Sequence, residues 1–287
     1  MDRLQRRSSG NHLDLAAIEP LLTTRWLGKA DGWDNELCDS IDSTNARASQ
    51  LSNSGAPAGL IVLARHQTAG RGRQGRTWVS PADAGIYMSC LLRPTGNKAD
   101  LPLHTIACGV ACVQAIWEVT GLSIGLKWVN DLVAGRKKVG GILAELSGGP
   151  NAGPGEKELS LILGIGINLH LDQAILPDDL KGKVDSLENL SGQDINPNLL
   201  VAALVNHLEA TVDLLDRQGS LAILNSWRQH SVTLGHQIHA TCGDWQIDGE
   251  AIDIDDSGGL IIETADRGRI TLSAGTITIR RSDGTYS

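Results

Sequence analysis

The residues with the clearest chemistry lie in one glycine-rich segment, Gly70–Arg76, which reads GRGRQGR. It carries three guanidinium groups, on Arg71, Arg73 and Arg76, which repel one another unless anions lie between them. Arginine suits carboxylate and phosphate because it donates two parallel hydrogen bonds. A ligand anion at ~4 Å gains roughly 4 kcal/mol per charge at an effective dielectric of about 20. The glycines predict a loop that is mobile when empty and closes over a multiply anionic ligand; the alternative is a solvated basic loop.

The same segment matches the G-x-G-x-x-G pattern of dinucleotide-binding proteins at Gly70, Gly72 and Gly75. That function needs a helix to begin at the third glycine, with its N-terminus at the pyrophosphate. Here the third glycine is followed by RTWVSP (76–81), in which Trp, Val, Ser and Pro disfavour a helix. Because no clear βαβ unit surrounds the motif either, we reject a nicotinamide dehydrogenase.

A second candidate is a lysine at the start of an apolar strand. In RKKVGGIL (136–143), Lys138 opens the strand, and Gly140 and Gly141 let a ligand approach the backbone closely. An ammonium group in that place suits a carboxylate or a phosphoryl oxygen. Taken alone, a lysine that snorkels at a sheet end is the simpler interpretation.

Amide and carboxylate side chains follow two predicted strands. Asn130 and Asp131 end the motif KWVND (127–131), where a turn is expected, and taken alone they are turn residues. Asn168 ends the apolar run LGIGIN (163–168). Its amide either terminates the strand or holds a nucleotide phosphate or a metal-bound water.

A short polar segment, DSTN (42–45), precedes a stretch with helix-forming residues, 46–51. Ser43 or Thr44 is a natural helix N-cap, because its hydroxyl can accept from a free N–H of the first turn. A helix N-terminus also presents its remaining N–H groups to a polar ligand. The segment is therefore a structural cap or one wall of a binding site.

The elements that must position these residues mix strands with helices. Apolar runs of strand length predict strands at 60–64, 86–92, 124–129, 139–146 and 159–169. Helical spacing predicts helices at 101–119, 198–216 and 220–229, and one or two short helices within 13–28. Because strands and helices do not alternate strictly, we expect an α+β fold rather than a doubly wound sheet.

The pattern changes near residue 231. Residues 232–281 contain short alternating segments separated by turn residues, which is typical of a small β-barrel. We therefore expect two domains, 1–231 and 232–287.

The composition and charge of the chain exclude several classes of function. The chain has 287 residues with 41% apolar and 20% charged side chains, which predicts a globular protein with a full core. A net charge of −8 disfavours general affinity for nucleic acid. No continuous apolar run approaches the ~18 residues of a membrane span, and the N-terminus lacks the apolar centre of a signal peptide, so we expect a cytoplasmic protein without membrane association. The five cysteines lack paired C-x-x-C spacing and predict buried structural thiols.

The motifs are more informative together, in their order along the chain, than each is alone. They are DSTN (42–45), QTxGRGRxGR (67–76), KWxND (127–131) with KxGGIL (138–143), and GIGIN (164–168). Together they resemble biotin–protein ligases, and SAGTITIR (273–280) resembles the end of that family's SH3-like domain. The resemblance covers about residues 40–281. It implies a mixed-sheet catalytic domain of the biotin/lipoate ligase type with a C-terminal SH3-like β-barrel, in a short form without the DNA-binding domain of some members.

The resemblance implies a two-step reaction. The biotin carboxylate attacks the α-phosphate of ATP with Mg²⁺ and gives biotinyl-5′-AMP and pyrophosphate. A lysine of a biotin carboxyl carrier protein then attacks the mixed anhydride. The implied partners are biotin and this carrier protein, with no DNA, for a monomer or homodimer. The residues suit this chemistry because two anions must be brought together by concentrated positive charge.

The resemblance also implies a role for each motif residue. Arg73 and Lys138 are the expected catalytic residues. The expected biotin-binding residues are Ser43, Thr44, Asn45, Gln67, Gly70, Arg71, Gly72, Arg73, Lys138 and Gly141. The residues expected to serve ATP and Mg²⁺ are Arg76, Trp78, Lys127, Asn130, Asp131, Asn168 and Arg280.

Two positions depart from the family pattern, and two other functions remain open. Val129 stands where the family often has Pro, and Thr276 stands where it often has an acidic residue. A lipoate or octanoate ligase or transferase shares the acyl-transfer logic, and a non-catalytic biotin sensor shares the pocket. The arginine-glycine loop and the C-terminal barrel favour biotin, while Lys138 and Arg73 favour catalysis.

Overall fold

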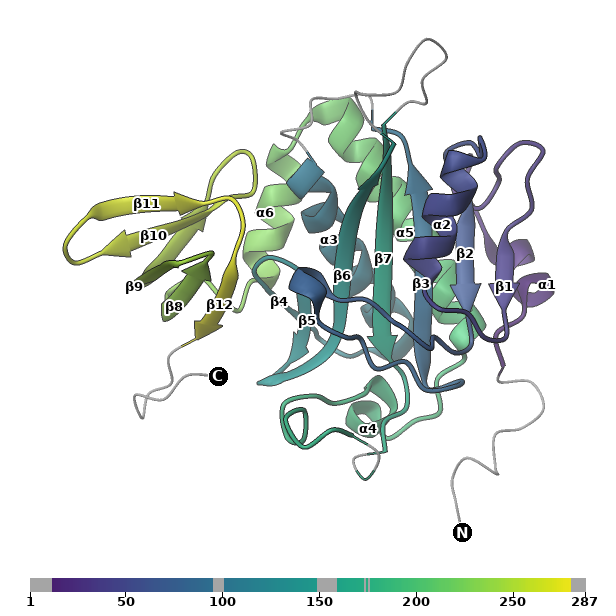
Figure 1. The fold of residues 1–287 in the computed structure, drawn as a ribbon, viewed down its shortest axis with the longest axis horizontal. Coiled ribbons are helices and arrows are strands. Elements are labelled where there is room, and N and C mark those ends of the chain that lie inside the picture. The colour runs from purple at the N-terminus through teal and green to yellow at the C-terminus, as the bar shows by residue number, and fades with distance from the viewer. Residues whose placement is uncertain (1–11, 95–100, 149–158, 173, 175, 280–287) are drawn as a thin grey trace.

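The computed structural model describes residues 12–94, 101–148, 159–172, 174 and 176–279. Within them the chain forms two sheets (Figure 1). The larger has the order β1-β2-β3-β7-β6-β5-β4, with β1 (Glu36–Cys38), β2 (Ile61–Ala64), β3 (Gly85–Leu92), β4 (Gly125–Lys127), β5 (Asp131–Ala134), β6 (Lys137–Ser147) and β7 (Ser160–Asn168). Strands β1 and β2 are parallel and the other neighbours antiparallel, so the predicted α+β fold with a mixed sheet is confirmed.

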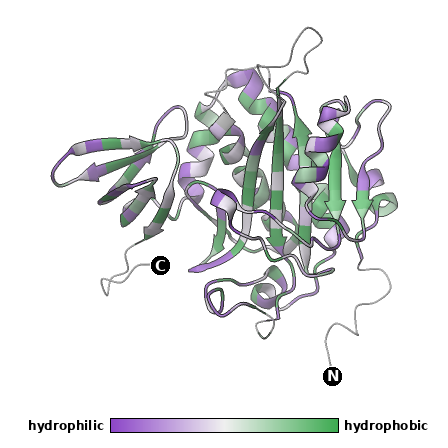
Figure 2. Ribbon diagram, in the orientation of Figure 1, coloured by the Kyte–Doolittle hydropathy of each residue, from purple (hydrophilic) through white to green (hydrophobic). Residues whose placement is uncertain are grey.

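Helices cover both faces of this sheet. Along β2, Ile61 and Leu63 belong to the large core with α3 (Leu101–Thr120) and α5 (Pro197–Gln218), whereas Val62 packs with α2 (Thr44–Asn53). Successive side chains of a strand point to opposite faces, so α2 lies on one face and α3 and α5 on the other. Every residue of β3 is buried, as expected for a strand covered on both sides, and Figure 2 shows largely hydrophobic colouring along the strands of the larger sheet.

Among the residues that the structure describes, two helices are long and apolar enough to cross a membrane by length and composition alone. They are the segments Pro102–Thr120 and Pro197–Gln218, and 72% and 67% of their apolar windows are buried inside the protein. Such burial is what a core helix between a sheet and its neighbours requires, so this property is weak evidence for a membrane span.

The three most buried cysteines lie in this core. Cys90 on β3 and Cys108 and Cys112 on α3 have no exposed surface, and burial raises the pKa of the Cys90 thiol to about 12. Cys38 and Cys242 are half-buried. The prediction of buried thiols therefore holds for three of the five.

The second sheet is antiparallel, in the order β11-β10-β9-β8-β12. Its strands are β8 (His236–Cys242), β9 (Trp245–Ile254), β10 (Leu260–Thr264), β11 (Gly268–Leu272) and β12 (Thr276–Ile279). Its arrangement is that of the expected SH3-like domain. Trp128 Nε1 donates to the Gly258 carbonyl at 3.0 Å, and Arg228 on α6 (Leu221–His230) donates to Asp253 at 2.7 Å. These buried and half-buried contacts hold the small sheet against the large one.

The sequence patterns missed three elements. They are β1, β5 and the five-residue helix α4 (Leu187–Ser191). The one or two short helices expected within 13–28 are confirmed as α1 (Leu15–Ile18) and a 3₁₀ turn, Glu19–Leu21. Elements of three to five residues contain too few positions to show a hydrophobic period. Contacts with neighbouring parts of the chain therefore determine whether they form.

Candidate active site

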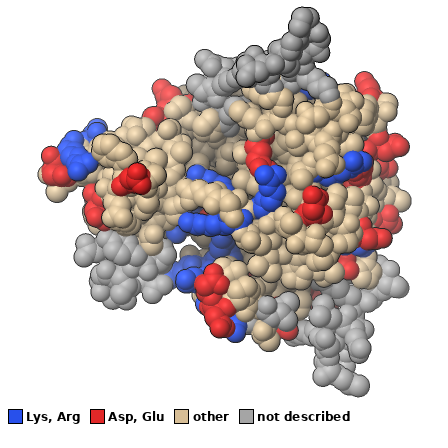
Figure 3. All heavy atoms as spheres, viewed as in Figure 1, with Lys and Arg blue, Asp and Glu red and all other residues tan. Residues whose placement is uncertain are grey.

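A cleft of about 1460 Å³ lies between the larger sheet and the small one. Among the described residues that line it are eight Lys and Arg side chains and a single carboxylate, that of Asp131. Figure 3 shows a band of basic side chains between the two parts of the molecule, while most acidic side chains lie toward the edges of this face. An acidic protein therefore gathers positive charge at one place, as the binding of an anionic ligand requires.

One end of the cleft is neutral and begins at the N-terminus of α2. The Ser43 hydroxyl caps this helix by accepting from the Ala46 N–H at 3.5 Å. Gln67 Oε1 accepts from the Thr44 N–H at 2.9 Å and lies 3.2 Å from the Thr44 hydroxyl, while Gln67 Nε2 donates to Ser80 Oγ at 2.9 Å. The DSTN segment is thus a helix cap that also lines the cleft, and its part in ligand binding stays a prediction.

Asn45 is held from several sides at this neutral end. Its Oδ1 lies 2.6 Å from the hydroxyl of Ser89, which has no exposed surface, and its Nδ2 donates to Glu145 Oε2 at 2.8 Å. A Cβ on Gly164 would come within 2.2 Å of Asn45 Oδ1, so only glycine fits there. The first glycine of the GIGIN motif therefore makes room for Asn45.

The arginine-glycine loop folds back on itself beside this end. The Gly72 N–H donates to the Arg76 carbonyl at 2.7 Å, and the Trp78 N–H donates to the Gly70 carbonyl at 2.9 Å. A 3₁₀ turn, Arg73–Gly75, forms the tip, with Gln74 at φ 55°. No α-helix begins at Gly75, which agrees with the rejection of a dinucleotide site.

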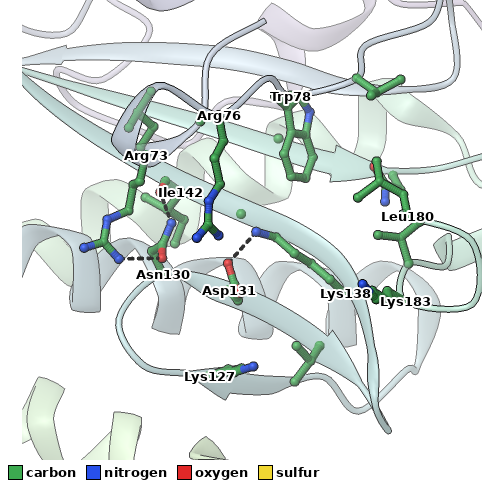
Figure 4. A pocket seen from close by; sticks show the side chains of 18 of the residues that line it. Arg73, Arg76, Trp78, Lys127, Asn130, Asp131, Lys138, Ile142, Leu180 and Lys183 are labelled. Carbon is green, nitrogen blue, oxygen red and sulfur yellow. Dashed lines mark hydrogen bonds and ion pairs between the residues drawn. The ribbon is translucent and has the colours of Figure 1, made fainter. Parts of the chain in front are cut away.

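The other end of the cleft is charged (Figure 4). Arg73 donates to Asn130 Oδ1 at 3.1 Å, and Asn130 Nδ2 donates to the Ile142 carbonyl at 2.7 Å. Lys138 Nζ lies 2.5 Å from Asp131 Oδ1. The turn between β4 and β5 thus supplies an amide that orients one cation and a carboxylate that pairs with another.

Burial, and to a smaller extent neighbouring charges, change the pKa values of two cations in the cleft. Burial lowers the pKa of Arg73, as does the neighbouring Arg76, while Asp131 opposes the shift. Burial also lowers the pKa of Lys127, and Lys138 adds to the effect. The charged form of each side chain is therefore disfavoured in the empty cleft, and a bound anion would stabilise it.

Trp78 forms a flat wall between the two ends. Lys138 Nζ lies 5.4 Å from the centre of its ring, a cation–π contact. A Cβ on Gly166 would lie 2.6 Å from the indole, and one on Gly141 would lie 3.2 Å from Lys138. These glycines allow the indole and the lysine side chain to lie directly against the strands.

All of the predicted site residues except Gly70 and Arg280 line this cleft. Gly70 packs beneath the loop, where a Cβ would lie 2.4 Å from the Trp78 carbonyl, and Arg280 lies outside the described residues. Asn168 Nδ2 donates to the Asp185 carbonyl at 3.0 Å, so its structural role as a strand end is also real.

Sequence reasoning missed one wall of the cleft. The segment 176–184 lines it, and the Lys138 N–H donates to the Lys183 carbonyl at 2.9 Å. The pair of lysines in KGK (181–183) was the available signal. The small sheet also contributes: Thr276 on β12 donates from Oγ1 to Gln74 Oε1 at 3.1 Å, which joins the loop tip to the C-terminal domain.

Known proteins share this architecture. Residues 37–168 match the Biotin/lipoate A/B protein ligase family, and residues 233–280 match the Biotin protein ligase C terminal domain. The bifunctional ligase/repressor BirA of Bacillus subtilis (strain 168) is 34% identical over 79% of this chain and 68% of its own length. The biotin--[acetyl-CoA-carboxylase] ligase of Paracoccus denitrificans is 35% identical over 77% of this chain and 90% of its own length. The biotin protein ligase from Aquifex aeolicus, solved in complex with biotin and ATP, is 28% identical with a TM-score of 0.73, covering 87% of this chain and 100% of that chain.

The family matches and the relatives assign this mixed sheet, with its cationic cleft and small antiparallel domain, to the ligases. The chain belongs to the biotin/lipoate A/B protein ligase family. Within that family it is a biotin protein ligase, an ATP-dependent enzyme, because the C-terminal domain and the relatives are of that kind. These matches do not favour the two alternatives, a lipoate or octanoate enzyme and a non-catalytic biotin sensor.

Proposed function

We propose that this cleft binds biotin at its neutral end and ATP at its charged end, and that the bound biotin is activated and passed to a carrier protein. The observation that carries the proposal is that eight cations and one carboxylate are found among the described lining residues, in a chain of net charge −8. A single ligand site typically has ~300–1,000 Å³. The cleft, at about 1460 Å³, has room for two ligands side by side.

The neutral end suits the uncharged ring of biotin. Ser43, Thr44 and Gln67 offer hydroxyl and amide groups in fixed orientations, because the capped helix and Ser80 hold them. Asn45 completes this wall. A urea group both donates and accepts hydrogen bonds, and prearranged partners of both kinds bind it without reorganisation.

The charged end suits the first chemical step. A biotin carboxylate oxygen attacks the α-phosphorus of ATP, the bond from that phosphorus to the bridging oxygen of the β-phosphate breaks, and pyrophosphate leaves. Lys138 exchanges Asp131 for the incoming carboxylate and phosphoryl oxygens. Arg73, oriented by Asn130, neutralises charge that develops at the α-phosphate, and Arg76 and Lys127 hold the remaining phosphates.

The cleft fits Mg²⁺ that arrives on the triphosphate. Magnesium sites for nucleotides use one or two carboxylates together with substrate phosphates and waters. Asp131, the one carboxylate among the described lining residues, would hold the ion, with Asn130 and Asn168 beside it. The ion would neutralise phosphate charge, and Trp78 would frame the adenylate.

In the second step the uncharged amine of an acceptor lysine attacks the acyl carbon of biotinyl-5′-AMP. The anhydride C–O bond breaks, AMP leaves, and the amine loses a proton to become an amide. We propose a biotin carboxyl carrier protein as the acceptor, residues 1–231 as the catalytic domain and 232–287 as the small domain. A cytoplasmic location and a monomeric or homodimeric state also remain predictions.

The test is biotin-dependent release of pyrophosphate from ATP by the purified protein with Mg²⁺ and no acceptor. We expect one burst that matches the enzyme concentration, and then a mass gain of one biotinyl group on an added carrier domain. Lipoate and octanoate in place of biotin serve as matched controls. Release with lipoate alone would assign another acid, and no release with any of them would overturn the proposal.

A further inference from the structure

The face of β6 next to α2 carries a carboxylate that none of the sequence motifs includes. We infer that Glu145 is a positioning residue, which anchors Arg71 of the arginine-glycine loop and thereby links the loop to the polar groups of the biotin end. The inference rests on the proposed function for its catalytic consequence, because the loop covers the ligand that this function assigns.

Both carboxylate oxygens of Glu145 are engaged. Oε1 lies 3.1 Å from an Arg71 guanidinium nitrogen, and Oε2 accepts from Asn45 Nδ2 at 2.8 Å. The Glu145 side chain is 30% exposed and that of Arg71 52%, while Asn45 is 4% exposed. One carboxylate thus joins a buried residue of the pocket wall to a residue of the outer loop.

The contact extends into a continuous polar chain. Asn45 Oδ1 contacts the Ser89 hydroxyl at 2.6 Å, and that hydroxyl lies 2.8 Å from Thr44 Oγ1. Thr44 in turn contacts Gln67, whose amide donates to Ser80 at 2.9 Å. Arg71 and Ser80 flank the tip of the loop, so both of its ends are tied to the residues assigned to the biotin ring.

This arrangement separates Arg71 from the other loop arginines. Its charge is balanced by Glu145, whereas Arg73 has a neutral amide partner. We therefore assign Arg71 to holding the loop and Arg73 to the ligand anion. The pair therefore ties one edge of the loop to Asn45, which Ser89 already holds in place.

Amide hydrogen exchange of the ligand-free protein tests the anchor without any need for activity. Glu145→Gln keeps the shape but cannot accept from both Arg71 and Asn45, so exchange at residues 71–77 should rise about threefold, as expected for a partly exposed ion pair. Glu36→Gln is the matched control, because Glu36 pairs with Arg47 at 2.7 Å and is 28% exposed, away from the cleft. Equal exchange in wild type and Glu145→Gln would overturn the inference.

Retention of biotinyl-5′-AMP tests the catalytic consequence. Glu145→Gln and Arg71→Gln should each release the adenylate about fivefold faster, and the double variant should add little, because both changes break one contact. Multiplying effects would reject the coupling. A wild-type protein that forms no adenylate would reject the proposed function, and the exchange experiment would still decide the role of Glu145.

Discussion

The two ends of the cleft are built on opposite principles. At the neutral end, Thr44, Asn45 and Ser89 are each at most 4% exposed, and each has hydrogen-bond partners within the protein. At the charged end, Lys138 and Asp131 are about a third exposed. Burial and the neighbouring Arg76 lower the pKa of Arg73 there.

The difference indicates where binding free energy is used. A wall that is already hydrogen-bonded binds its ligand without reorganisation and discriminates by shape and polarity. A cluster of cations gains most when negative charge arrives and increases, which is the condition for accelerating a reaction. We therefore expect changes at the neutral end to affect mainly the KM for biotin, and changes at the charged end to affect mainly kcat.

The largest effect is expected from Arg73→Ala. The change removes the cation that Asn130 orients toward the cleft, so the rate of adenylate formation should fall by about 10²–10³, the usual loss for one donor that stabilises transition-state charge. The Kd for biotin should change little, because the neutral end is untouched. Single-turnover pyrophosphate release and biotin titration measure the two quantities. Arg73→Lys, which keeps the charge but loses the fork of donors, should recover only part of the rate; equal losses in rate and biotin affinity would remove the contrast between the ends.

The residues at the two ends of the cleft differ in how readily the sequence alone identifies them. The arginine-glycine loop, Lys138 and the DSTN segment carry their chemistry in side-chain type, so the sequence was enough to select them. The sequence does not indicate Glu145, because a glutamate in an alternating strand normally faces water. Its contacts with Asn45 and Arg71, which lie far away in the sequence, form only in the folded chain. Ser89, inside an apolar strand, is hidden for the same reason.

The sequence also predicts only part of the fold. Long periodic segments such as α3 and α5 were predicted almost to their ends, because apolar spacing over 20 residues is unambiguous. The sequence predicts a turn at Asn130 and Asp131 but no strand after it, because strand β5 is defined by its pairing with β4 and β6. The cleft wall at 176–184 has no period, and its backbone contact with Lys138 determines its position.

Two glycines of β7 allow the contrast to be tested from one strand. A Cβ on Gly164 would displace Asn45, whereas a Cβ on Gly166 would displace Trp78. Gly164→Ala should therefore raise the KM for biotin about tenfold, and Gly166→Ala should raise the KM for ATP by a similar factor, each about 1.4 kcal/mol. Steady-state kinetics with each substrate varied in turn measure both. Each variant is the control for the other, and equal changes in both KM values would show that the ends are not separable.

The loop provides a dynamic form of the comparison. Because Arg73 and Arg76 repel each other until an anion binds, residues 71–76 should exchange amide hydrogens about tenfold more slowly with biotinyl-5′-AMP than in the free protein, where the Arg71–Glu145 pair holds one edge of the loop. Helix α2, which is already capped and packed, should be protected to the same degree in both states. Hydrogen exchange followed by mass spectrometry compares the two segments in one sample, and equal loop protection with and without ligand would reject a closing loop.

The smallest effect concerns the support of the charged end. Asp185 accepts from Lys137 at 2.9 Å, and its N–H donates to the Lys138 carbonyl at 2.9 Å. Burial alone would raise the pKa of Asp185, but hydrogen bonds from Lys137, Ser186 and Asn189 outweigh it, so the pKa lies below its ordinary value. A lowered pKa means that the carboxylate stabilises the fold fully above about pH 3.9, and that this contribution is lost as the pH falls through the folded-state value.

Asp185→Asn should therefore lower the free energy of unfolding by about 1 kcal/mol at neutral pH, and by progressively less as the medium becomes more acidic than pH ~4. Urea unfolding at a series of pH values measures this difference. Asp178→Asn is the control, because Asp178 pairs with Lys181 at 2.6 Å but is 95% exposed, and it should change stability little at any pH. A penalty for Asp185→Asn that stays constant into acid would mean that the side chain supports Lys137 and Lys138 through shape alone, and that its charge does not contribute to the charged end.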